Sequence, residues 1–327
     1  MSNDQMIVGI GNALVDVVAS VPEAALARHS LEKGGMALVD SAAAEALYGE
    51  VGPGVQQSGG SVANSIAHLA DVGLPGCYLG KVADDDLGAH FRKEMTDLGI
   101  ACPVPAGTGG PGTGRCVVLV TPDGERTMST FLGAAQGLAT ADIDAAMPER
   151  FAMLLVEGYL WDAPEGDAVI AAAARKAKAA GARVALTPSD AGCVERNRDA
   201  MLGFITAHCD VLIGNHHEVG ALSGNDDPEA ALDWALSQVD TVAVTESEKG
   251  SRVANGGGRH RIAAEPVSRV LDTTGAGDAY ASGFLAGLVR GKPIAEAARD
   301  GASLAATVLT HYGARDGEAA RALPRAG

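Results

Sequence analysis

The sequence predicts an α/β protein with a doubly wound, mostly parallel sheet flanked by helices, and a second, small β-sheet that forms a lid. From Ala152 onward, short apolar runs alternate with helical stretches, which is the pattern of successive β-α units in a parallel sheet. A glycine-rich turn, Gly275-Ala276-Gly277, directly precedes a helical pattern. Two regions outside this alternation, 13–40 and 102–132, contain short β-like runs and loops. They are the predicted lid.

Composition limits the class of protein. The 327 residues suffice for one large α/β domain with an embellishment or for two ordinary domains. A net charge of −16 argues against nucleic acid or an anionic membrane as a partner. The five cysteines are odd in number and lack a CxxC pair, which is typical of reduced thiols. Without a basic leader or a membrane-length apolar run, the expectation is a soluble, cytoplasmic protein, monomeric or homodimeric.

The first hundred residues predict four strands or β-like runs and two helices. A short apolar strand is expected over 6–11, followed by β-like runs at 15–21 and 36–40. The stretch 57–73 contains the turn Gly59-Gly60 and then a helix, which Ser61 is able to cap and which Gly73 ends. A strand at 77–82 and a helix at 85–98 come next. The run Asp84-Asp85-Asp86 is open to reading as a metal site, but it favours a turn and helix start.

The lid is completed by a hairpin. The loop 102–114 is rich in Pro, Gly and Thr, and the strand-like runs 115–121 and 125–132 flank Asp123-Gly124, a strong turn signal. The predicted division is therefore a core of 1–12, 41–101 and 133–327 with a lid of 13–40 and 102–132. The lid is expected to close over the substrate and exclude water.

The second half supplies the sheet and its helices. Strands are expected at 152–156, 183–187, 210–213 and 241–244. A helix at 164–180 has proline at its start and Gly181 just past its end. A glycine-rich hairpin is expected at 253–263, before the turn Gly275-Ala276-Gly277. A further helix is expected at 294–309, and the tail after Arg315 is expected to be solvated.

The turn before Asp278 is predicted to form an anion-binding site. Small residues let the backbone bend and direct unpaired N–H groups outward at a helix N-terminus, where the helix dipole adds about half a positive charge. Gly283 and Gly287 within that helix indicate a backbone packed tightly on the sheet. Asp278 in the first turn is either a favourable charge at the dipole or a base beside a bound phosphate, and the dipole is expected to lower its pKa.

Polar residues follow the predicted strands, at the sheet edge where ligands bind in open α/β folds. They are Asn12, Gly158, Ser189, Asn215 and Thr245. His217 and Glu218 lack the spacing of a zincin motif. Asn215 and Glu218, three residues apart, are able to share a helix face and hold Mg²⁺ through water.

Four motifs in this order resemble the PfkB, or ribokinase-like, kinase family. They are GNALVD at 11–16, GGSVANSIAHLA at 59–70, the Asn215-x-x-Glu218 pair and DTTGAGD at 272–278. The resemblance spans about residues 6 to 314. GNALVD, GGSVANS and GERTMSTFLGAA at 124–135 are most similar to the adenosine kinases of that family, which act in purine salvage. The resemblance implies a ribokinase-like fold and transfer of the γ-phosphoryl group of MgATP to an alcohol.

The resemblance also implies roles for individual residues. Asp278 would accept the proton of the substrate hydroxyl, the amides of Gly275, Ala276 and Gly277 would hold the γ-phosphoryl group, and Arg126 would neutralise phosphates. The substrate would be bound by Asn12, Asp16, Gly59, Gly60, Ser61, Asn64, Tyr159 and Thr274. The nucleotide would be bound by Asn215, Thr245, Glu246, Gly250 and Gly277. Mg²⁺ would be held through Glu218 and Asn215, and K⁺ by Asp272, Thr273 and Gly313.

Several residues have plainer readings. Asp16 reads also as a solvated lid charge, Asn64 as a substitute helix cap, Arg126 as an exposed hairpin residue and Tyr159 as part of the core. Thr274, where animal adenosine kinases resemble one another in having asparagine, and the pair Tyr159-Leu160 depart from the adenosine kinase pattern near the base pocket.

Three functions remain open at this point. The first is phosphorylation of the 5′-hydroxyl of a nucleoside, foremost adenosine. The second is phosphorylation of a sugar such as ribose or fructose. The third, a Rossmann dinucleotide enzyme, is disfavoured because Gly9-Ile10-Gly11 is not completed by a glycine at Leu14 and Asp16 comes too soon. A non-catalytic binding protein would leave Asp278 without a use.

Overall fold

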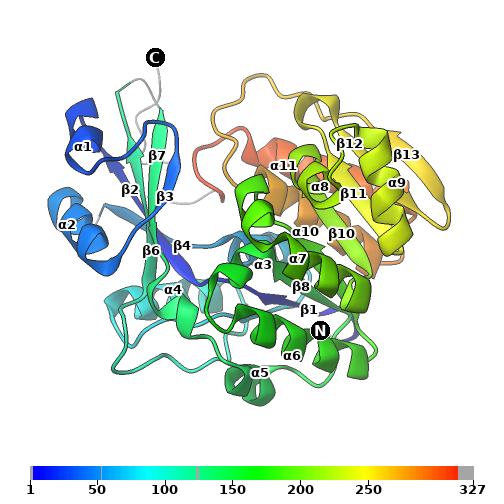
Figure 1. The fold of residues 1–327 in the computed structure, drawn as a ribbon, viewed down its shortest axis with the longest axis horizontal. Coiled ribbons are helices and arrows are strands. Elements are labelled where there is room, and N and C mark those ends of the chain that lie inside the picture. The colour runs from blue at the N-terminus through cyan, green and yellow to red at the C-terminus, as the bar shows by residue number, and fades with distance from the viewer. Residues whose placement is uncertain (1–2, 53, 123–124, 316–327) are drawn as a thin grey trace.

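The computed structural model describes residues 3–52, 54–122 and 125–315. Two sheets organise these residues: one of eight strands in the order β13-β12-β11-β10-β9-β8-β1-β5, and one of five strands in the order β3-β7-β6-β2-β4. This is the predicted ribokinase-like arrangement, a large sheet with a smaller one beside it (Figure 1).

The large sheet is parallel from β5 through β11, and β12 and β13 close its far edge as an antiparallel hairpin. The hairpin predicted at 253–263 is therefore confirmed, and it extends the main sheet. The strands are β1 (Ile7–Ile10), β5 (Gly76–Leu79), β8 (Met153–Glu157), β9 (Arg183–Thr187), β10 (Val211–Asn215), β11 (Thr241–Thr245), β12 (Ser251–Asn255) and β13 (Gly258–Ile262).

Helices cover both faces of this sheet. On one face the core includes Val169, Cys193 and Leu232 from helices α5 to α9. On the other it includes Val62 and Phe284 from α3, α4, α10 and α11. The helices are α3 (Ser61–Asp71), α4 (Asp86–Asp97), α5 (Thr140–Ala146), α6 (Gly166–Ala179), α7 (Ala191–His208), α8 (His216–Ser223), α9 (Pro228–Gln238), α10 (Ala276–Val289) and α11 (Ile294–Val308).

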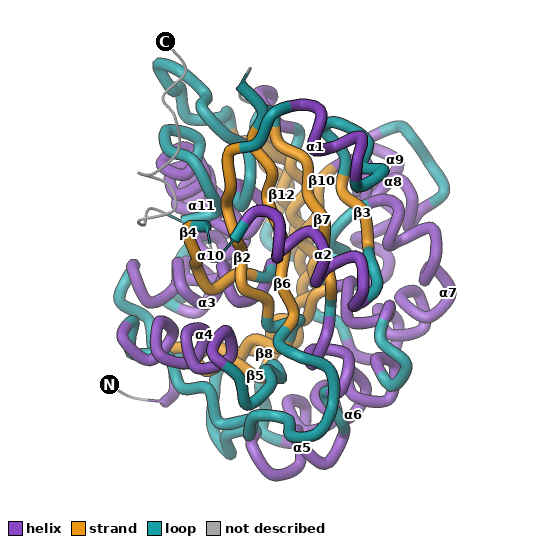
Figure 2. The backbone as a smooth tube through the Cα atoms, turned by 90° about the vertical axis from the view of Figure 1, so that its left-hand side faces the viewer, coloured by secondary structure: helices purple, strands orange, loops and turns teal. Residues whose placement is uncertain are grey.

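The small sheet presents one face to the core and the other to a cavity. On β2, Val15 and Val17 are fully buried in the core, whereas the alternating Leu14 and Asp16 line the cavity. Figure 2 shows helices α1 (Glu23–Arg28) and α2 (Ser41–Val51) over this sheet. Its strands are β2 (Leu14–Ser20), β3 (Met36–Leu38), β4 (Val55–Gly59), β6 (Gly114–Val120) and β7 (Arg126–Phe131).

The sequence did not indicate helices α1, α2 and α5, nor strand β4. Its residues, VQQSG, lack apolar alternation, and it pairs antiparallel with β2 along the edge of the small sheet. Strands β6 and β7 confirm the predicted hairpin, whose turn at Asp123-Gly124 lies outside the described residues, as does the tail after Arg315. The boundary between core and lid stays a prediction.

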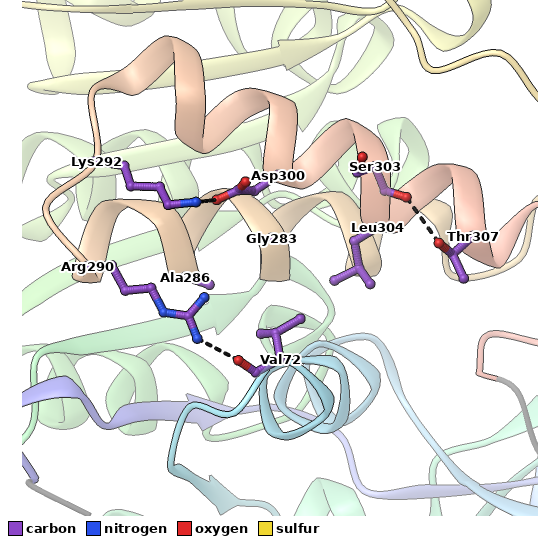
Figure 3. A pocket seen from close by; sticks show the side chains of 9 residues that line it. All are labelled: Val72, Gly283, Ala286, Arg290, Lys292, Asp300, Ser303, Leu304 and Thr307. Carbon is purple, nitrogen blue, oxygen red and sulfur yellow. Dashed lines mark hydrogen bonds and ion pairs between the residues drawn. The ribbon is translucent and has the colours of Figure 1, made fainter.

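Two glycines of α10 correct a prediction. They allow close packing, but against α11 and not against the sheet: a Cβ on Gly283 would lie 2.5 Å from the Asp300 carbonyl oxygen, and one on Gly287 would lie 2.6 Å from the Ala297 Cα. Figure 3 shows the resulting surface hollow, where Lys292 pairs with Asp300 at 2.6 Å. This packing fixes the direction of α10 and so the position of its first turn.

Local capping settles two further expectations. Asp85 caps α4 by accepting from the Gly88 amide at 2.8 Å, so the Asp84-Asp85-Asp86 run is a turn and helix start. Ser61 does not cap α3; the N-cap is Gly60, with φ of 101°. No helix among the described residues has the length and apolar character needed to cross a membrane.

Candidate active site

A cavity of about 690 Å³ opens between the small sheet and the carboxyl ends of the large sheet's strands. It brings together most of the sequence-predicted residues. Those that line it are Asn12, Asp16, Gly60, Ser61, Asn64, Tyr159, Asn215, Glu218, Thr274, Gly275, Gly277 and Asp278. The rule that ligands bind beyond strand ends in open α/β sheets therefore selects this place.

Asp278 lines the cavity from the first turn of α10. Ser61 Oγ donates to its Oδ1 at 2.6 Å, and Asn64 Nδ2 lies 3.4 Å from its Oδ2. Both partners belong to α3, whose packing against α10 is reinforced where Ser282 Oγ donates to the Ser65 carbonyl at 2.9 Å. The carboxylate is thus held in one orientation by a neighbouring helix.

The pKa of Asp278 differs from the sequence expectation. Burial raises the pKa to about 7, the hydrogen bonds from Ser61 and Asn64 lower it, and the nearby charge of Asp16 raises it again. The predicted lowering by the helix dipole is therefore wrong in its net result, because desolvation outweighs the favourable terms. A carboxylate with this pKa is a stronger base than an exposed one.

The N-terminus of α10 offers unpaired amides beside that carboxylate. Gly275, with φ of 77°, is the N-cap, and a Cβ there would lie 2.6 Å from the Ala314 Cα. The Ala276 amide donates back to the Thr273 carbonyl at 3.2 Å, and the Ala279 amide donates to the Gly275 carbonyl. Among the described residues the amides of Gly277 and Asp278 are consequently left for an anion.

Two buried asparagines carry polar atoms without partners. Asn12 is 2% exposed, and neither its Oδ1 nor its Nδ2 forms a hydrogen bond within the described part of the chain; the same holds for Asn64 Oδ1. Buried polar groups are nearly always paired, so such a cluster beside a cavity indicates a polar ligand. Three positions for hydrogen bonds to hydroxyl groups are thus available next to Asp278.

Asp16 faces the same space from the small sheet. Burial raises its pKa to about 6, with Arg315 opposing this shift. Gly59 gives it room, because a Cβ at that position would lie 2.5 Å from the Asp16 carboxylate. Gly60 fits under the Asn12 carbonyl, 2.2 Å from where its Cβ would be. Both glycines are required by close approach.

Glu157 is a site residue that sequence reasoning missed. It ends β8, is 1% exposed, and lines the cavity. Its Oε1 accepts from the backbone N–H of Asn12 at 2.8 Å, and its Oε2 accepts from the backbone N–H of Val62 at 3.0 Å. Glu157 thereby caps the N-terminus of α3, which Ser61 does not cap. Burial raises its pKa to about 7. The sequence feature that could have identified Glu157 is a carboxylate at the end of a predicted strand, directly before Gly158, which the sequence already places at the ligand-binding edge of the sheet.

Arg315 is the second missed residue. It is 5% exposed, and its Nη2 donates to the Ser58 carbonyl and, at 2.7 Å, to Ser58 Oγ. His68 on α3 contacts the neighbouring Ala314 carbonyl at 2.9 Å. Ala314 and Arg315 are thereby anchored beside α3 and β4, and Arg315 acts on the charge of Asp16. Its place at the start of a polar tail hid this role.

Asn215 and Glu218 form a reciprocal cap at the start of α8. Asn215 Oδ1 accepts from the amides of His217 and Glu218, while the Glu218 carboxylate accepts from the amide of Asn215 at 3.0 Å and from its side chain. Burial raises the pKa of Glu218 to about 7. Because Glu218 already has these partners, it suits a hydrated Mg²⁺ held mainly by phosphates.

Arg126 pairs with Asp272 at 2.5 Å, and its Nη2 has no hydrogen-bond partner among the described residues. Asp272 also accepts from the Gly313 amide at 2.7 Å and, through its other oxygen, from Thr274 Oγ1 and the Thr274 amide. Neither Arg126 nor Thr273 is among the residues lining the cavity. A K⁺ ion bound by the Asp272 side chain would have to displace Arg126, so the potassium site stays a prediction.

Three predicted nucleotide-binding residues lie outside the lining of this cavity. Thr245 ends β11, and the buried Glu246 pairs with Arg252 at 2.9 Å. Gly250 has φ of 89°, and a Cβ there would lie 1.9 Å from the Ile262 carbonyl oxygen, so the turn into β12 requires glycine. Their contact with nucleotide stays a prediction.

A doubly wound sheet, a lid sheet, and a carboxylate beside unpaired helix amides define a phosphotransferase that acts on a small alcohol. The sequence matches the model of the pfkB family carbohydrate kinases over residues 36–321. The chain belongs to the pfkB family, and it is a kinase with an alcohol group as acceptor.

Solved structures share the whole fold. Adenosine kinase from Sinorhizobium meliloti superposes with a TM-score of 0.88 at 38% identity over 98% of both chains. A probable sugar kinase from Rhizobium etli gives 0.89 at 34% identity, again over 98% of both. Guanosine-inosine kinase of Escherichia coli K12 is 29% identical over 265 residues, which cover 76% of this chain but 59% of that relative. Relatives thus include nucleoside and sugar kinases.

Proposed function

We propose that this protein transfers the γ-phosphoryl group of MgATP to the 5′-hydroxyl of a nucleoside, with adenosine the acceptor favoured by the motifs. The observation that carries the proposal is the group of unpaired buried atoms on Asn12 and Asn64 beside Asp278. A ribose offers hydroxyl groups that both donate and accept, which suits amide and carboxylate partners.

The charge of the cavity supports a neutral acceptor. Six carboxylates and one guanidinium line it: Asp16, Glu157, Asp162, Asp190, Glu218, Asp278 and Arg196. A phosphorylated sugar would meet repulsion there, whereas a nucleoside or free sugar would not. MgATP brings its own cation to the anionic site.

Asp278 would accept the proton of the 5′-hydroxyl as that oxygen bonds to the γ-phosphorus and the bond to the β-phosphate oxygen breaks, releasing ADP. The amides of Gly277 and Asp278 would stabilise the charge on the transferring group. Asn12, Asp16 and Asn64 would orient the ribose. Bound Mg²⁺, reached through Glu218 and Asn215, would neutralise phosphate charge. Arg126 would add a cation, and Thr245, Glu246 and Gly250 would flank the nucleotide.

The alternative acceptor is a sugar such as ribose or fructose. It is favoured by the same hydroxyl-binding groups and by the likeness to the Rhizobium etli structure. The apolar part of the cavity argues for a larger group, because Met36, Leu38 and Leu132 line it and a free sugar would leave them without a partner.

Replacement of Asp278 by asparagine tests the proposal. We expect kcat with MgATP and nucleoside to fall about 10²–10⁴-fold with little change in substrate binding. Asp300→Asn, in the hollow on the other side of α10, is the matched control and should keep full turnover. Full turnover by Asp278→Asn would refute the assignment of the base.

A panel of nucleosides and free sugars tests the acceptor. Turnover of ribose with none of any nucleoside would establish the alternative. The same assay with KCl, and with a salt of a large organic cation in its place, tests the predicted K⁺ site, because an enzyme that uses K⁺ would have a higher rate in KCl.

A further inference from the structure

Arg196 and Asp162 form a pair in the cavity that the phosphoryl-transfer chemistry does not use. Arg196 lies on α7, and Asp162 follows β8 in the short helix Gly158–Asp162. The guanidinium binds the carboxylate side-on, with Nε 3.2 Å from Oδ1 and Nη2 2.8 Å from Oδ2. Asn197 Nδ2 holds the same Oδ1 at 2.9 Å. Asp162 is therefore fixed from two sides, and it fixes Arg196.

This arrangement leaves the end of the guanidinium free. Arg196 Nη1 donates to none of the residues that the structure describes, and the side chain is 50% exposed where it lines the cavity. Nη1 and the second hydrogen of Nη2 point along the end-on edge of the planar group. That edge binds two acceptors side by side on one planar partner.

Other residues that line the same cavity suit a flat, largely apolar group. The lid wall of the cavity runs from β4 and β2, which hold Gly59 and Asp16, across to β7 and β3. On β3, Met36 and Leu38 are 42% and 49% exposed, the largest unburied apolar side chains of the lid that line the cavity. Tyr159 lies one helical turn before Asp162. A base attached to a ribose at Asp16 and Asp278 would share one cavity with these residues, which offer it apolar surface.

We infer that Arg196, held by Asp162, reads the polar edge of the nucleobase and makes the enzyme prefer 6-oxopurine nucleosides to adenosine. The inference rests on the proposed nucleoside kinase function and revises its order of substrates. Guanine and hypoxanthine present O6 and N7 as adjacent acceptors, the pair that an arginine binds in bidentate fashion, whereas adenine places an N6 donor beside N7. Two of the motifs that favoured adenosine hold Asn12, Asp16 and Asn64, which the proposed function assigns to the ribose, and none of the three motifs contains Arg196 or Asp162.

An anionic ligand fits this place less well. The charge of Arg196 is already balanced by Asp162, and Asp190 also lines the cavity nearby. A phosphate would need a cation in excess, whereas a neutral pair of acceptors needs only donors.

The test compares kcat/KM for inosine, guanosine and adenosine with MgATP. We expect the wild-type protein to prefer inosine and guanosine, and Arg196→Met to lower the ratio of inosine to adenosine about tenfold or more. The matched control is Arg175→Met, an exposed arginine on α6, which should leave this ratio unchanged. The ratio is an internal measure, so a uniform loss from poor folding does not move it.

A modified substrate isolates the contact. 7-Deazaguanosine lacks the N7 acceptor, so it should lose about tenfold relative to guanosine in the wild type and much less in Arg196→Met. Preference for adenosine in the wild type, or an inosine-to-adenosine ratio unmoved by Arg196→Met, would overturn the inference while leaving nucleoside kinase activity in place. Absence of turnover with every nucleoside would instead refute the proposed function.

Discussion

Glu157→Gln is the change that most directly tests how the site is held together. The carboxylate accepts one amide with each oxygen, from Asn12 at 2.8 Å and from Val62 at 3.0 Å. Glutamine keeps one acceptor but turns an NH₂ group toward the other amide. The loss of one charge-assisted hydrogen bond costs about 2 kcal/mol. If losing this hydrogen bond displaces Asn12 and α3 from their positions in the site, transition-state binding weakens by up to the same amount, and kcat/KM declines by up to about 30-fold.

The pH dependence separates this role from a structural one. Because burial raises the pKa of Glu157 to about 7, the wild-type side chain is itself protonated at pH 5.5 and then also lacks one acceptor. The ratio of wild-type to Glu157→Gln kcat/KM should therefore be small at pH 5.5 and reach its full value near pH 8.5. Asp278 titrates in both proteins and largely cancels in the ratio.

The assay is initial-rate kinetics with MgATP and the best nucleoside across that pH range, with Glu229→Gln as the control for an exposed carboxylate. A ratio that is large but independent of pH would mean that Glu157 does not titrate near neutrality. A ratio close to one throughout would refute its role in positioning Asn12 and α3.

Two further predictions concern the same cavity. Gly59→Ala should raise the KM for the acceptor at least about tenfold, because the added Cβ would displace the Asp16 carboxylate. Steady-state kinetics measures this KM, with Gly203→Ala as the control, and an unchanged KM would contradict the prediction. The thermal unfolding midpoint of the ligand-free protein should decrease as the pH is raised from 5.5 to 8. Folding raises the pKa of four buried carboxylates to about 6–7, and their contribution to the stability of the folded state is lost as the pH rises through these values. Calorimetry that shows a midpoint increasing over this range would disprove the prediction. The carboxylates are Asp16, Glu157, Glu218 and Asp278.

The sequence was informative where one residue type has one local use. The turn at Gly275, the capping pair Asn215 and Glu218, and the alternation of strands and helices are local patterns, and the structure contains each of them. Strand β4 was not predictable because its residues gain their β structure from pairing with β2, not from their own pattern.

Long-range partners account for the remaining differences. Ser61 resembles a helix cap in sequence, yet its hydroxyl bonds Asp278, 217 residues away, while Glu157 from β8 closes the helix instead. Arg315 opens a polar tail but is buried against Ser58. Neither pairing is encoded in the spacing of nearby residues, because each depends on which strand ends meet at the cavity.

The pKa of Asp278 follows from the same arrangement. A motif specifies that an acid opens α10, and the helix dipole alone would make that acid a weak base. Burial in the assembled cavity removes water and Asp16 adds negative charge, and together they raise the pKa to about 7 against the hydrogen bonds from Ser61 and Asn64. The local sequence thus determines which residue would take the proton, whereas the assembled cavity determines the pKa of that residue. A general base is most effective when its pKa lies near the working pH, and the cavity brings the pKa of Asp278 to that range.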